Sequence, residues 1–296
     1  MYKITKVEIL ADQIYLMDVV APRIADSCQP GQFVIVKMDE KGERIPLTIC
    51  DYNREDSTVT IVFQAIGAST QKMVALKEGD SFRDVTGPLG RPSEFIEEEL
   101  EELKNKRFLF VAGGVGTAPV YPQVKWLHEH GINADVVVGA KTRDMLILEE
   151  QMRAVAGNLY ITTDDGSYGN KGLVTDVVRK LVQEQGKEYD VCVAIGPMIM
   201  MKFVCLLTKE LKIPTIVSMN PIMVDGTGMC GACRLTVGDE VKFACVDGPE
   251  FDGHKINFDE AMKRQQMYKT KEGRAILKVR EGDTHHGGCG SCGGEE

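Results

Sequence analysis

Residues 107–119 read Arg-Phe-Leu-Phe-Val-Ala-Gly-Gly-Val-Gly-Thr-Ala-Pro. The apolar run before the glycines is typical of a strand buried inside a parallel sheet, and an amphipathic helix is expected at 120–130. A strand, a glycine turn and a helix in this order direct the N-terminus of the helix towards the pyrophosphate of a dinucleotide. The residues expected to bind the dinucleotide in this turn are Gly113, Gly114, Gly116, Thr117, Ala118 and Pro119.

The alternation of strands and helices continues after this motif. The expected elements are strands at 134–139, 159–163, 190–195 and 213–217, with helices at 145–155 and 173–185. This order predicts a Rossmann-like α/β domain, in which helices cover both faces of a parallel sheet. The polar segment 97–106, which is acidic and then basic, is expected to form a helix that links this domain to the preceding part.

Two further loops follow the carboxyl ends of expected strands, where such sheets bind their ligands. Asp164 and Asp165, followed by Gly166, lie where the ribose of adenosine is expected. Two carboxylates there would accept hydrogen bonds from a free 2′-hydroxyl and repel a 2′-phosphate. The loop therefore favours NAD(H) over NADP(H), and a plain turn before the glycine is the alternative. In the other loop, the expected contacts are Gly196, Pro197 and Met198.

The N-terminal part has short β-branched segments separated by Gly, Pro, Asp and Asn. Strands are expected at 3–10, 14–20, 32–38, 45–51, 58–66 and 81–85. Such a series with almost no helix predicts a small antiparallel barrel.

Two motifs of this barrel carry functional groups. The segment Arg44-Ile-Pro46-Leu47-Thr48 places a cation and a hydroxyl on one face of a strand. The segment Gly67-Ala68-Ser69-Thr70 follows a strand and opens a helical stretch, so its backbone N–H groups could receive a phosphate. A solvated charge and a simple turn are the plain alternatives for either motif taken alone.

A cysteine loop follows the α/β pattern. It reads Asp225-Gly-Thr-Gly-Met-Cys230-Gly-Ala-Cys233, and Cys245 follows after eleven residues. Plant-type ferredoxins hold a [2Fe–2S] cluster with Cys-x4-Cys-x2-Cys and a distant fourth Cys, so Asp225 stands at the position of the first ligand. A hairpin at 235–237 and 241–245 would return Cys245 to the other ligands. A structural zinc site also favours Cys-x2-Cys pairs, and it remains the alternative.

Composition limits the classes of function. The chain has 296 residues, a net charge of −9 and a pI near 5.2, so nucleic acid is not an expected partner. Nine cysteines, three of them in the cluster loop, favour a reducing cytosol over a disulfide framework. The start of the chain is unlike a signal peptide, and the longest apolar stretch, 191–201, is too short to span a bilayer. A cytoplasmic protein without a membrane partner is expected.

The C-terminal region is polar, and a helix is expected at 259–266. The last residues are rich in Gly and contain His285, His286, Cys289 and Cys292. We expect a disordered tail, with metal binding or a redox role of its cysteines as the alternative.

Together these motifs resemble the ferredoxin reductase superfamily. The resemblance rests on Arg-x-Pro-Leu-Thr and Gly-x-x-Thr in the barrel, Gly-Gly-x-Gly-x-Ala-Pro in the nucleotide domain and the cluster loop. Within the superfamily, residues 1–265 are most similar to the small subunits of NADH-dependent reduced ferredoxin:NADP oxidoreductases, also described as sulfide dehydrogenases. Electron-transfer subunits of dihydroorotate dehydrogenases rank second, because they carry Cys at the position of Asp225.

The resemblance implies a role for each matching position. Arg44 would bind the pyrophosphate of FAD, Pro46, Leu47 and Thr48 would line its isoalloxazine ring, and Gly67, Ala68, Ser69 and Thr70 would hold phosphates. Thr48 is also the expected catalytic residue, and Val62 and Phe63 are expected to contact the cofactor. Leu47 replaces the Tyr that many reductases stack on the flavin, and Ile195 replaces a Cys common at the nicotinamide site.

The resemblance also implies four regions. They are an FAD-binding barrel at 1–98, an NAD(P)-binding α/β domain at 99–222, a [2Fe–2S] lobe at 223–265 and a C-terminal extension at 266–296. NADH would give a hydride to FAD, from which single electrons would pass to the cluster. The acceptor would be a larger flavin and iron–sulfur subunit, in a heterodimer that couples NADH, NADPH and ferredoxin by electron bifurcation. A stand-alone NAD(P)H reductase and a zinc-stabilised scaffold are the remaining alternatives.

Overall fold

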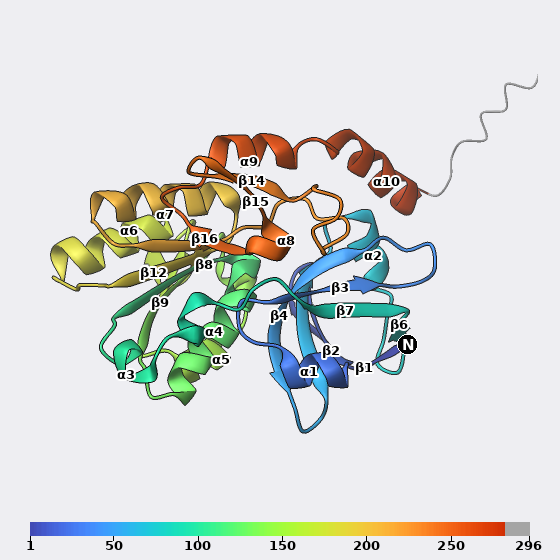
Figure 1. The fold of residues 1–296 in the computed structure, drawn as a ribbon, viewed down its shortest axis with the longest axis horizontal. Helices are drawn as coiled ribbons and strands as arrows, with labels where there is room; N and C mark the ends of the chain where they lie inside the picture. The colour runs from blue at the N-terminus through green and yellow to red at the C-terminus, as the bar shows by residue number, and fades with distance from the viewer. Residues whose placement is uncertain (282–296) are drawn as a thin grey trace, which may run out of the picture.

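Seven antiparallel strands form the N-terminal sheet of the computed structural model, which describes residues 1–281. They are β1 (Tyr2–Ala11), β2 (Ile14–Val20), β3 (Phe33–Lys37), β4 (Ile45–Asn53), β5 (Thr58–Gln64), β6 (Ser81–Phe82) and β7 (Asp84–Leu89). Their order is β6-β1-β2-β5-β4-β3-β7, and the sheet curves into a nearly closed barrel, on the right of Figure 1. The predicted barrel is confirmed.

Two details of the barrel differ from the prediction. The strand expected at 81–85 is two strands, because Phe82 pairs with β1 whereas Asp84 pairs with β3, and the chain turns a corner at Arg83. A short helix, α1 (Pro22–Ser27), was not predicted. Its proline occupies the first turn, where a missing N–H costs nothing, but six residues are too few to show a helical period.

The second sheet has the predicted α/β architecture. Its strands are β8 (Phe108–Gly113), β9 (Ala134–Ala140), β10 (Asn158–Thr163), β11 (Asn170–Lys171), β12 (Val191–Ile195), β13 (Thr215–Ser218) and β16 (Glu250–Asp252), in the order β11-β10-β9-β8-β12-β13-β16. All neighbours are parallel except β16, which pairs antiparallel with β13. The main helices are α4 (Thr117–Glu129), α5 (Glu149–Val155), α6 (Val174–Arg179), its π-helical continuation η4 (Lys180–Glu184) and α7 (Met198–Glu210).

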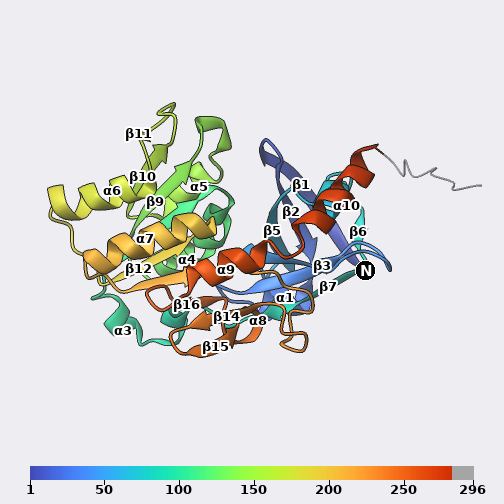
Figure 2. The same cartoon turned by 90° about the horizontal axis from the view of Figure 1, so that it is seen from above.

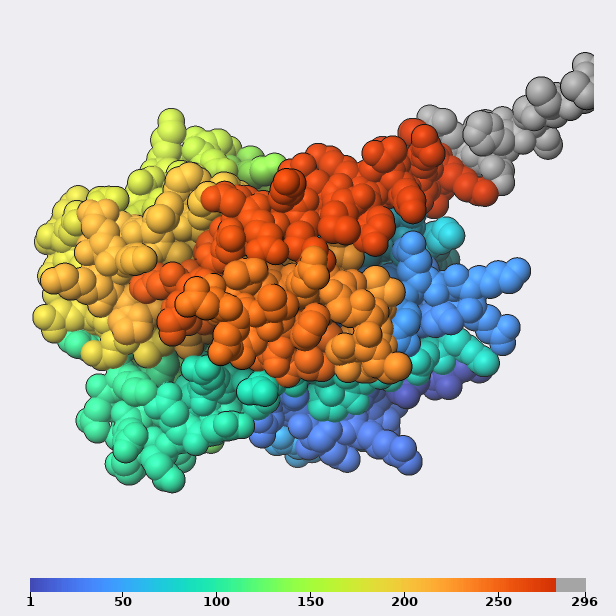
Figure 3. All heavy atoms as spheres, turned by 45° about the horizontal axis from the view of Figure 1, so that its top comes forward, coloured from blue at the N-terminus to red at the C-terminus, as the bar shows by residue number. Residues whose placement is uncertain are grey.

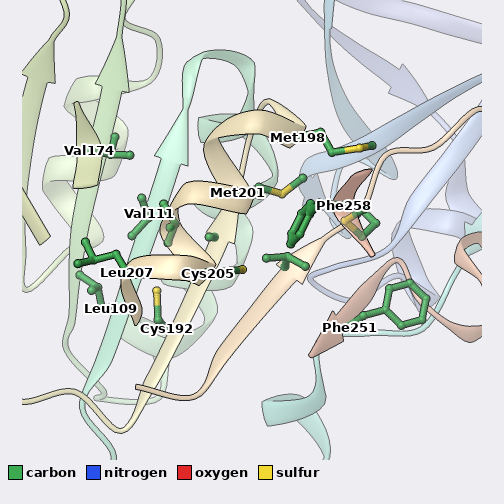
Figure 4. Packing of buried hydrophobic residues seen from close by; sticks show 14 of the residues in the cluster. Leu109, Val111, Val174, Cys192, Met198, Met201, Cys205, Leu207, Phe251 and Phe258 are labelled. Carbon is green, nitrogen blue, oxygen red and sulfur yellow. The ribbon is translucent and has the colours of Figure 1, made fainter. Parts of the chain in front are cut away.

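Helices cover both faces of this sheet, because alternate side chains of its strands are buried on opposite sides. Leu109 and Val111 of β8 pack with α6 and α7, as Figure 4 shows for Met201 and Leu207 of α7. The intervening residues of β8, such as Phe110, pack with α4 and α5. The linker helix expected at 97–106 is shorter than predicted, and consists of η1 (Glu94–Glu97) and α3 (Leu100–Leu103). Short 3₁₀ turns, η2 (Gly114–Gly116) and η3 (Arg143–Met145), precede α4 and α5.

The C-terminal segment adds a small lobe on top of the two sheets (Figure 1). It contains β14 (Arg234–Val237), β15 (Glu240–Phe243), α8 (Ala244–Asp247), α9 (Phe258–Gln265) and α10 (Lys269–Glu281). The predicted hairpin is shorter than expected, since β15 ends at Phe243 and Cys245 lies in α8. Helix α10 was not predicted, because its sequence is polar and contains Gly273. The tail residues His285, His286, Cys289 and Cys292 lie outside the described residues.

The C-terminal lobe lies across the boundary between the barrel and the α/β part. Figure 2 shows α9 and α10 in succession from the α/β part to the barrel, where α10 packs on α2 (Ala68–Met73), and Figure 3 shows that the lobe covers the boundary. The domain limits 1–98, 99–222 and 223–265 stay a prediction. Among residues 1–281, none of the helices has the length and apolar character needed to cross a bilayer.

A buried carboxyl group marks the meeting point of these parts. Glu250 of β16 accepts hydrogen bonds from Ser93 Oγ, at 3.0 Å, and from Gln123 Nε2 of α4, at 2.8 Å. Burial raises the pKa of Glu250 from 4.5 to about 7, against the lowering effect of these two donors. Between pH 4.5 and pH 7, the carboxyl group of Glu250 therefore keeps its proton in the folded protein and loses it in the unfolded chain.

We expect Glu250→Gln to make folding less sensitive to pH. Because the pKa of Glu250 is raised in the folded state, wild-type stability from this group is complete below pH 4.5 and is lost as the pH rises through 7. The free energy of unfolding of the variant, relative to that of wild type, should therefore rise by up to about 3 kcal/mol from pH 5 to pH 8. Urea unfolding at both pH values measures this difference, with exposed Glu55→Gln as the control. An equal pH dependence in wild type and Glu250→Gln would contradict the expectation.

Candidate functional site

A cleft of about 1000 Å³ lies between the barrel and the carboxyl ends of the parallel strands. It brings together predicted residues from both parts of the chain. From the barrel these are Pro46, Leu47, Thr48, Val62 and Phe63, and from the α/β part Gly113, Gly114, Gly116, Ala118, Pro119, Asp164, Gly196 and Pro197. The lining is mainly apolar, as expected for a site that encloses flat aromatic rings.

The glycines of this cleft are required by close contacts between strand ends. A Cβ at Gly116 would collide with the carbonyl oxygen of Ile195 and would lie 2.8 Å from the Cα of Gly196. A Cβ at Gly113 would collide with Met200 of α7. The turn therefore lies directly against the end of β12, and the N-terminus of α4 opens towards the cleft.

Other predicted nucleotide contacts lie outside the lining of the cleft. Thr117 is buried and donates a hydrogen bond from Oγ1 to the carbonyl oxygen of Gly114, at 2.9 Å, which fixes the glycine turn. Met198 is buried in the core at the start of α7. Asp165 accepts hydrogen bonds from the backbone N–H and the hydroxyl of Ser167, which lower its pKa, and Gly166 completes that turn at φ +78°. Asp164 alone of the two carboxylates faces the cleft.

Several lining residues were not predicted, among them Phe33, Lys141 and Asn220. Lys141 and Asp164 are the only charged residues of the lining among the described residues. Lys141 follows β9 directly, and the main chain joins the two loops, since Asp164 N donates to the carbonyl oxygen of Ala140. The rule that ligands bind at strand ends could have found Lys141, whereas Phe33 had no signal in the sequence.

The predicted phosphate contacts of the barrel also lie outside the cleft. Thr70 Oγ1 accepts a hydrogen bond from the backbone N–H of Gly67, at 2.9 Å, which fixes the start of α2. Ser69 donates from its hydroxyl to the carboxylate of Glu43, and Ala68 is the first residue of the same helix. Arg44 contacts the cysteine loop rather than α2. Their roles as FAD contacts stay a prediction.

The cysteine loop has the backbone that close wrapping requires. Gly226, Gly228 and Gly231 adopt φ values of +82°, +88° and +64°, a region that other residues rarely enter. Cys233 and Cys245 are buried with their sulfurs 3.3 Å apart, and Cys230 is exposed. The loop and α8 therefore bring Cys233 and Cys245 together, as predicted.

The four predicted ligands differ in their surroundings. The pKa of Cys230 is lowered by the backbone N–H of Ala232 and, to a smaller degree, by that of Asp225. Burial and the neighbouring Cys233 raise the pKa of Cys245 to about 12. The carboxylate of Asp225 accepts hydrogen bonds from Thr227 N, Thr227 Oγ1 and Met229 N at 3.0, 2.7 and 3.1 Å, and these lower its pKa.

The donor types at these positions are those that an iron–sulfur cluster takes. Within residues 1–281, no three His, Cys, Asp or Glu side chains lie close enough to hold one ion together. A [2Fe–2S] cluster needs four donors, and the residues that would hold it are Asp225, Cys230, Cys233 and Cys245. Backbone N–H groups directed at the sulfurs would stabilise thiolate ligands.

Comparison with known proteins assigns these features to a family. Residues 220–257 match the iron-sulfur cluster binding domain of dihydroorotate dehydrogenase B, and residues 110–206 match the oxidoreductase NAD-binding domain. A dihydroorotate dehydrogenase B electron transfer subunit homolog of Thermotoga maritima is 46% identical over 89% of this chain and 90% of its own length. The chain belongs to the dihydroorotate dehydrogenase B electron transfer subunit family. It is thus an oxidoreductase subunit for electron transfer, and the predicted iron–sulfur domain is confirmed over the zinc alternative.

Two further relatives bear on this electron transfer subunit. An uncharacterized protein of Clostridium beijerinckii is 65% identical over the full length of both chains. The solved structure of an NADH-dependent reduced ferredoxin-NADP oxidoreductase has a chain with a TM-score of 0.86 and 43% identity, covering 95% of this chain and 98% of that one. The predicted likeness to that enzyme is confirmed, together with the predicted fold.

Proposed function

We propose that this electron transfer subunit oxidises NADH and passes electrons through FAD and a [2Fe–2S] cluster to a larger flavin and iron–sulfur subunit. The complex would be an electron-bifurcating NADH-dependent ferredoxin:NADP oxidoreductase, in which NADP(H) and ferredoxin react through the partner. Two observations carry the proposal. The barrel and the glycine turn line the same cleft, and the cysteine loop packs on the same barrel. The likeness to the solved oxidoreductase supports this choice of complex.

Different residues of the cleft would bind FAD and NADH. When bound, FAD and the cluster supply the exchange between two-electron and one-electron transfer. Pro46, Leu47 and Thr48 would line the flavin ring, and the hydroxyl of Thr48 could hydrogen-bond its polar edge. The backbone N–H groups of the glycine turn and the N-terminus of α4 would receive the pyrophosphate of NADH. The apolar lining would exclude water from the reacting rings.

The surface around the cysteine loop fits the contact with a partner. Met229, next to exposed Cys230, is 88% exposed, Val224 at the start of the cysteine loop is 52% exposed, and Val246 of α8 is also exposed. Apolar side chains gathered at one exposed site are typical of protein interfaces. We therefore place the partner subunit over this loop, where electrons would leave.

All cysteines of the described residues are free, which supports a reducing, cytoplasmic location.

Anaerobic purification of the protein from its native source tests the proposal. The expected result is a coloured protein with flavin and [2Fe–2S] absorption, with iron and acid-labile sulfide, and with a larger flavin and iron–sulfur subunit bound. NADH should bleach both absorption bands. A colourless protein without iron would refute the function, and a coloured protein that purifies alone and reduces soluble acceptors rapidly would support the stand-alone reductase.

The family match favours a second candidate, the electron-transfer subunit of a dihydroorotate dehydrogenase. That function requires a partner that oxidises dihydroorotate, and electrons would then flow from the partner to NAD. The identity of the copurified subunit separates the two candidates, because only one of the two complexes would bleach its flavin on addition of dihydroorotate.

We expect Asp164→Asn to weaken the preference for NADH. Among residues 1–281, Asp164 supplies the only carboxylate of the cleft lining, and its removal would remove the repulsion of a 2′-phosphate. The ratio of kcat/KM for NADPH to that for NADH should therefore rise about tenfold. Asp165→Asn is the matched control, because Ser167 holds its carboxylate in the turn. Steady-state kinetics with both nucleotides measure the ratio. A larger change in Asp165→Asn than in Asp164→Asn would contradict this expectation.

A further inference from the structure

Arg44 of the barrel contacts the cysteine loop. The residue precedes β4, and its Nη2 donates a hydrogen bond to the main-chain carbonyl oxygen of Asp225, at 3.2 Å. Its Nη1 lies 4.0 Å from a carboxylate oxygen of Asp84 in β7. The Arg44 side chain is about one-third exposed, at 34%. A permanent cation of the barrel is therefore attached to the main chain of a predicted cluster ligand, 181 residues further along the chain.

The loop is seated on the barrel beside this contact. A Cβ at Gly226 would collide with Ile35 of β3 and would lie 3.3 Å from Leu89 of β7. On its other side, Asp225 is held through its carboxylate by Thr227 and Met229. The main chain of Asp225 is thus fixed by the barrel and its carboxylate by the loop, so Arg44 is well placed to control the position of this ligand.

We propose that Arg44 is a positioning residue for the iron–sulfur loop, which holds Asp225 in place and raises the reduction potential of the cluster. The proposal rests on the function proposed above, because it assumes that the loop holds a [2Fe–2S] cluster. Reduction adds one negative charge to the cluster, and a cation nearby stabilises that charge. Arginine is suited to this role because it stays protonated at all physiological pH values.

This role is compatible with the contact to the FAD pyrophosphate that the resemblance implies. A guanidinium has five N–H donors in a fixed plane, and the hydrogen bond to Asp225 uses one of them. Arg44 would then connect the flavin site to the cluster loop, and its removal would affect the cluster directly.

Redox titration of the cluster, followed by electron paramagnetic resonance, tests the proposal in Arg44→Met, Arg44→Lys and Arg83→Met. Arg83 is the control, because it pairs with Glu40 on an exposed part of the barrel. Arg44→Met should make cluster reduction about tenfold less favourable, a shift of about 59 mV to lower potential. Arg44→Lys should restore most of the potential but not the wild-type resonance spectrum, since a lysine keeps the charge and loses the planar donor geometry. Arg83→Met should match wild type.

Flavin-depleted wild type is titrated alongside the variants. A lower cluster potential in Arg44→Met, with an unchanged cluster potential in flavin-depleted wild type, supports a direct effect of Arg44 on the cluster. An unchanged potential in Arg44→Met, an equal shift in Arg83→Met, or the same shift after flavin depletion overturns the proposal while the proposed function stands. Wild-type protein without iron overturns both.

Discussion

Gly116→Ala is expected to lower kcat/KM for NADH by about 100-fold. The new methyl group would collide with the carbonyl oxygen of Ile195 and approach the Cα of Gly196, and both are main-chain atoms that no side-chain rotation can move. The glycine turn would have to shift away from the end of β12, which displaces the N-terminus of α4 from the pyrophosphate. Misplacement of a bound substrate by about 1 Å can cost two orders of magnitude in rate.

Stopped-flow reduction of the flavin by NADH measures this effect. Gly131→Ala is the control, because Gly131 follows the other end of α4 with φ +76° and an added methyl group there would have no neighbouring atom within 4 Å. It should lose some stability from strain, but not the reaction with NADH. Flavin and iron contents should stay at wild-type values in both variants. An NADH reaction in Gly116→Ala within a few fold of wild type would refute the assignment of this turn.

Asp225→Cys is expected to lower the reduction potential of the cluster by an amount on the order of 100 mV. A carboxylate oxygen donates less electron density to iron than a thiolate does, so the natural ligand favours the reduced cluster. The expected shift is smaller than the ~250 mV or more that separates Rieske centres from plant-type clusters, because a single ligand changes. It corresponds to about 50-fold in the equilibrium constant for one electron.

The hydrogen bonds of Asp225 complicate this comparison, and a second variant controls for them. The carboxylate accepts three hydrogen bonds from Thr227 and Met229, and a thiolate would accept them more weakly. Thr227→Val removes the hydroxyl donor to the Asp225 carboxylate and leaves the iron ligand unchanged. It should therefore change the reduction potential of the cluster only slightly. Anaerobic redox titration of the three proteins gives the potentials. Equal or higher potential in Asp225→Cys than in wild type would show that Asp225 is not an iron ligand.

Local patterns in the sequence predicted the two sheets and much of the cleft. The apolar run at 107–112, the glycines after it and the strands that follow are signals carried by neighbouring residues, and they predicted β8, the glycine turn and α4. The strand period placed Arg44 and Thr48 on one face, whereas Pro46 was expected at the site only from the family resemblance. These features depend on backbone preferences and on side-chain period, which act over a few residues.

The sequence did not show which of several possible contacts its residues make. The sequence does not show that Asp165 caps a turn while Asp164 enters the cleft, because the choice depends on Ser167 and on the fold of the loop. Helix α10 lies on α2, about 200 residues earlier in the chain, and its polar sequence did not indicate this contact.

The chain composition and its motifs alone determined the class of this protein: a nucleotide-binding sheet, a barrel and four donors with the spacing of a two-iron cluster. The tertiary structure alone decided which of these residues meet. It placed Cys245 on a short helix against Cys233, and Arg44 against the main chain of Asp225. The physical reason is that ligand identity is a property of residue type and spacing, whereas convergence requires packing between segments far apart in the chain.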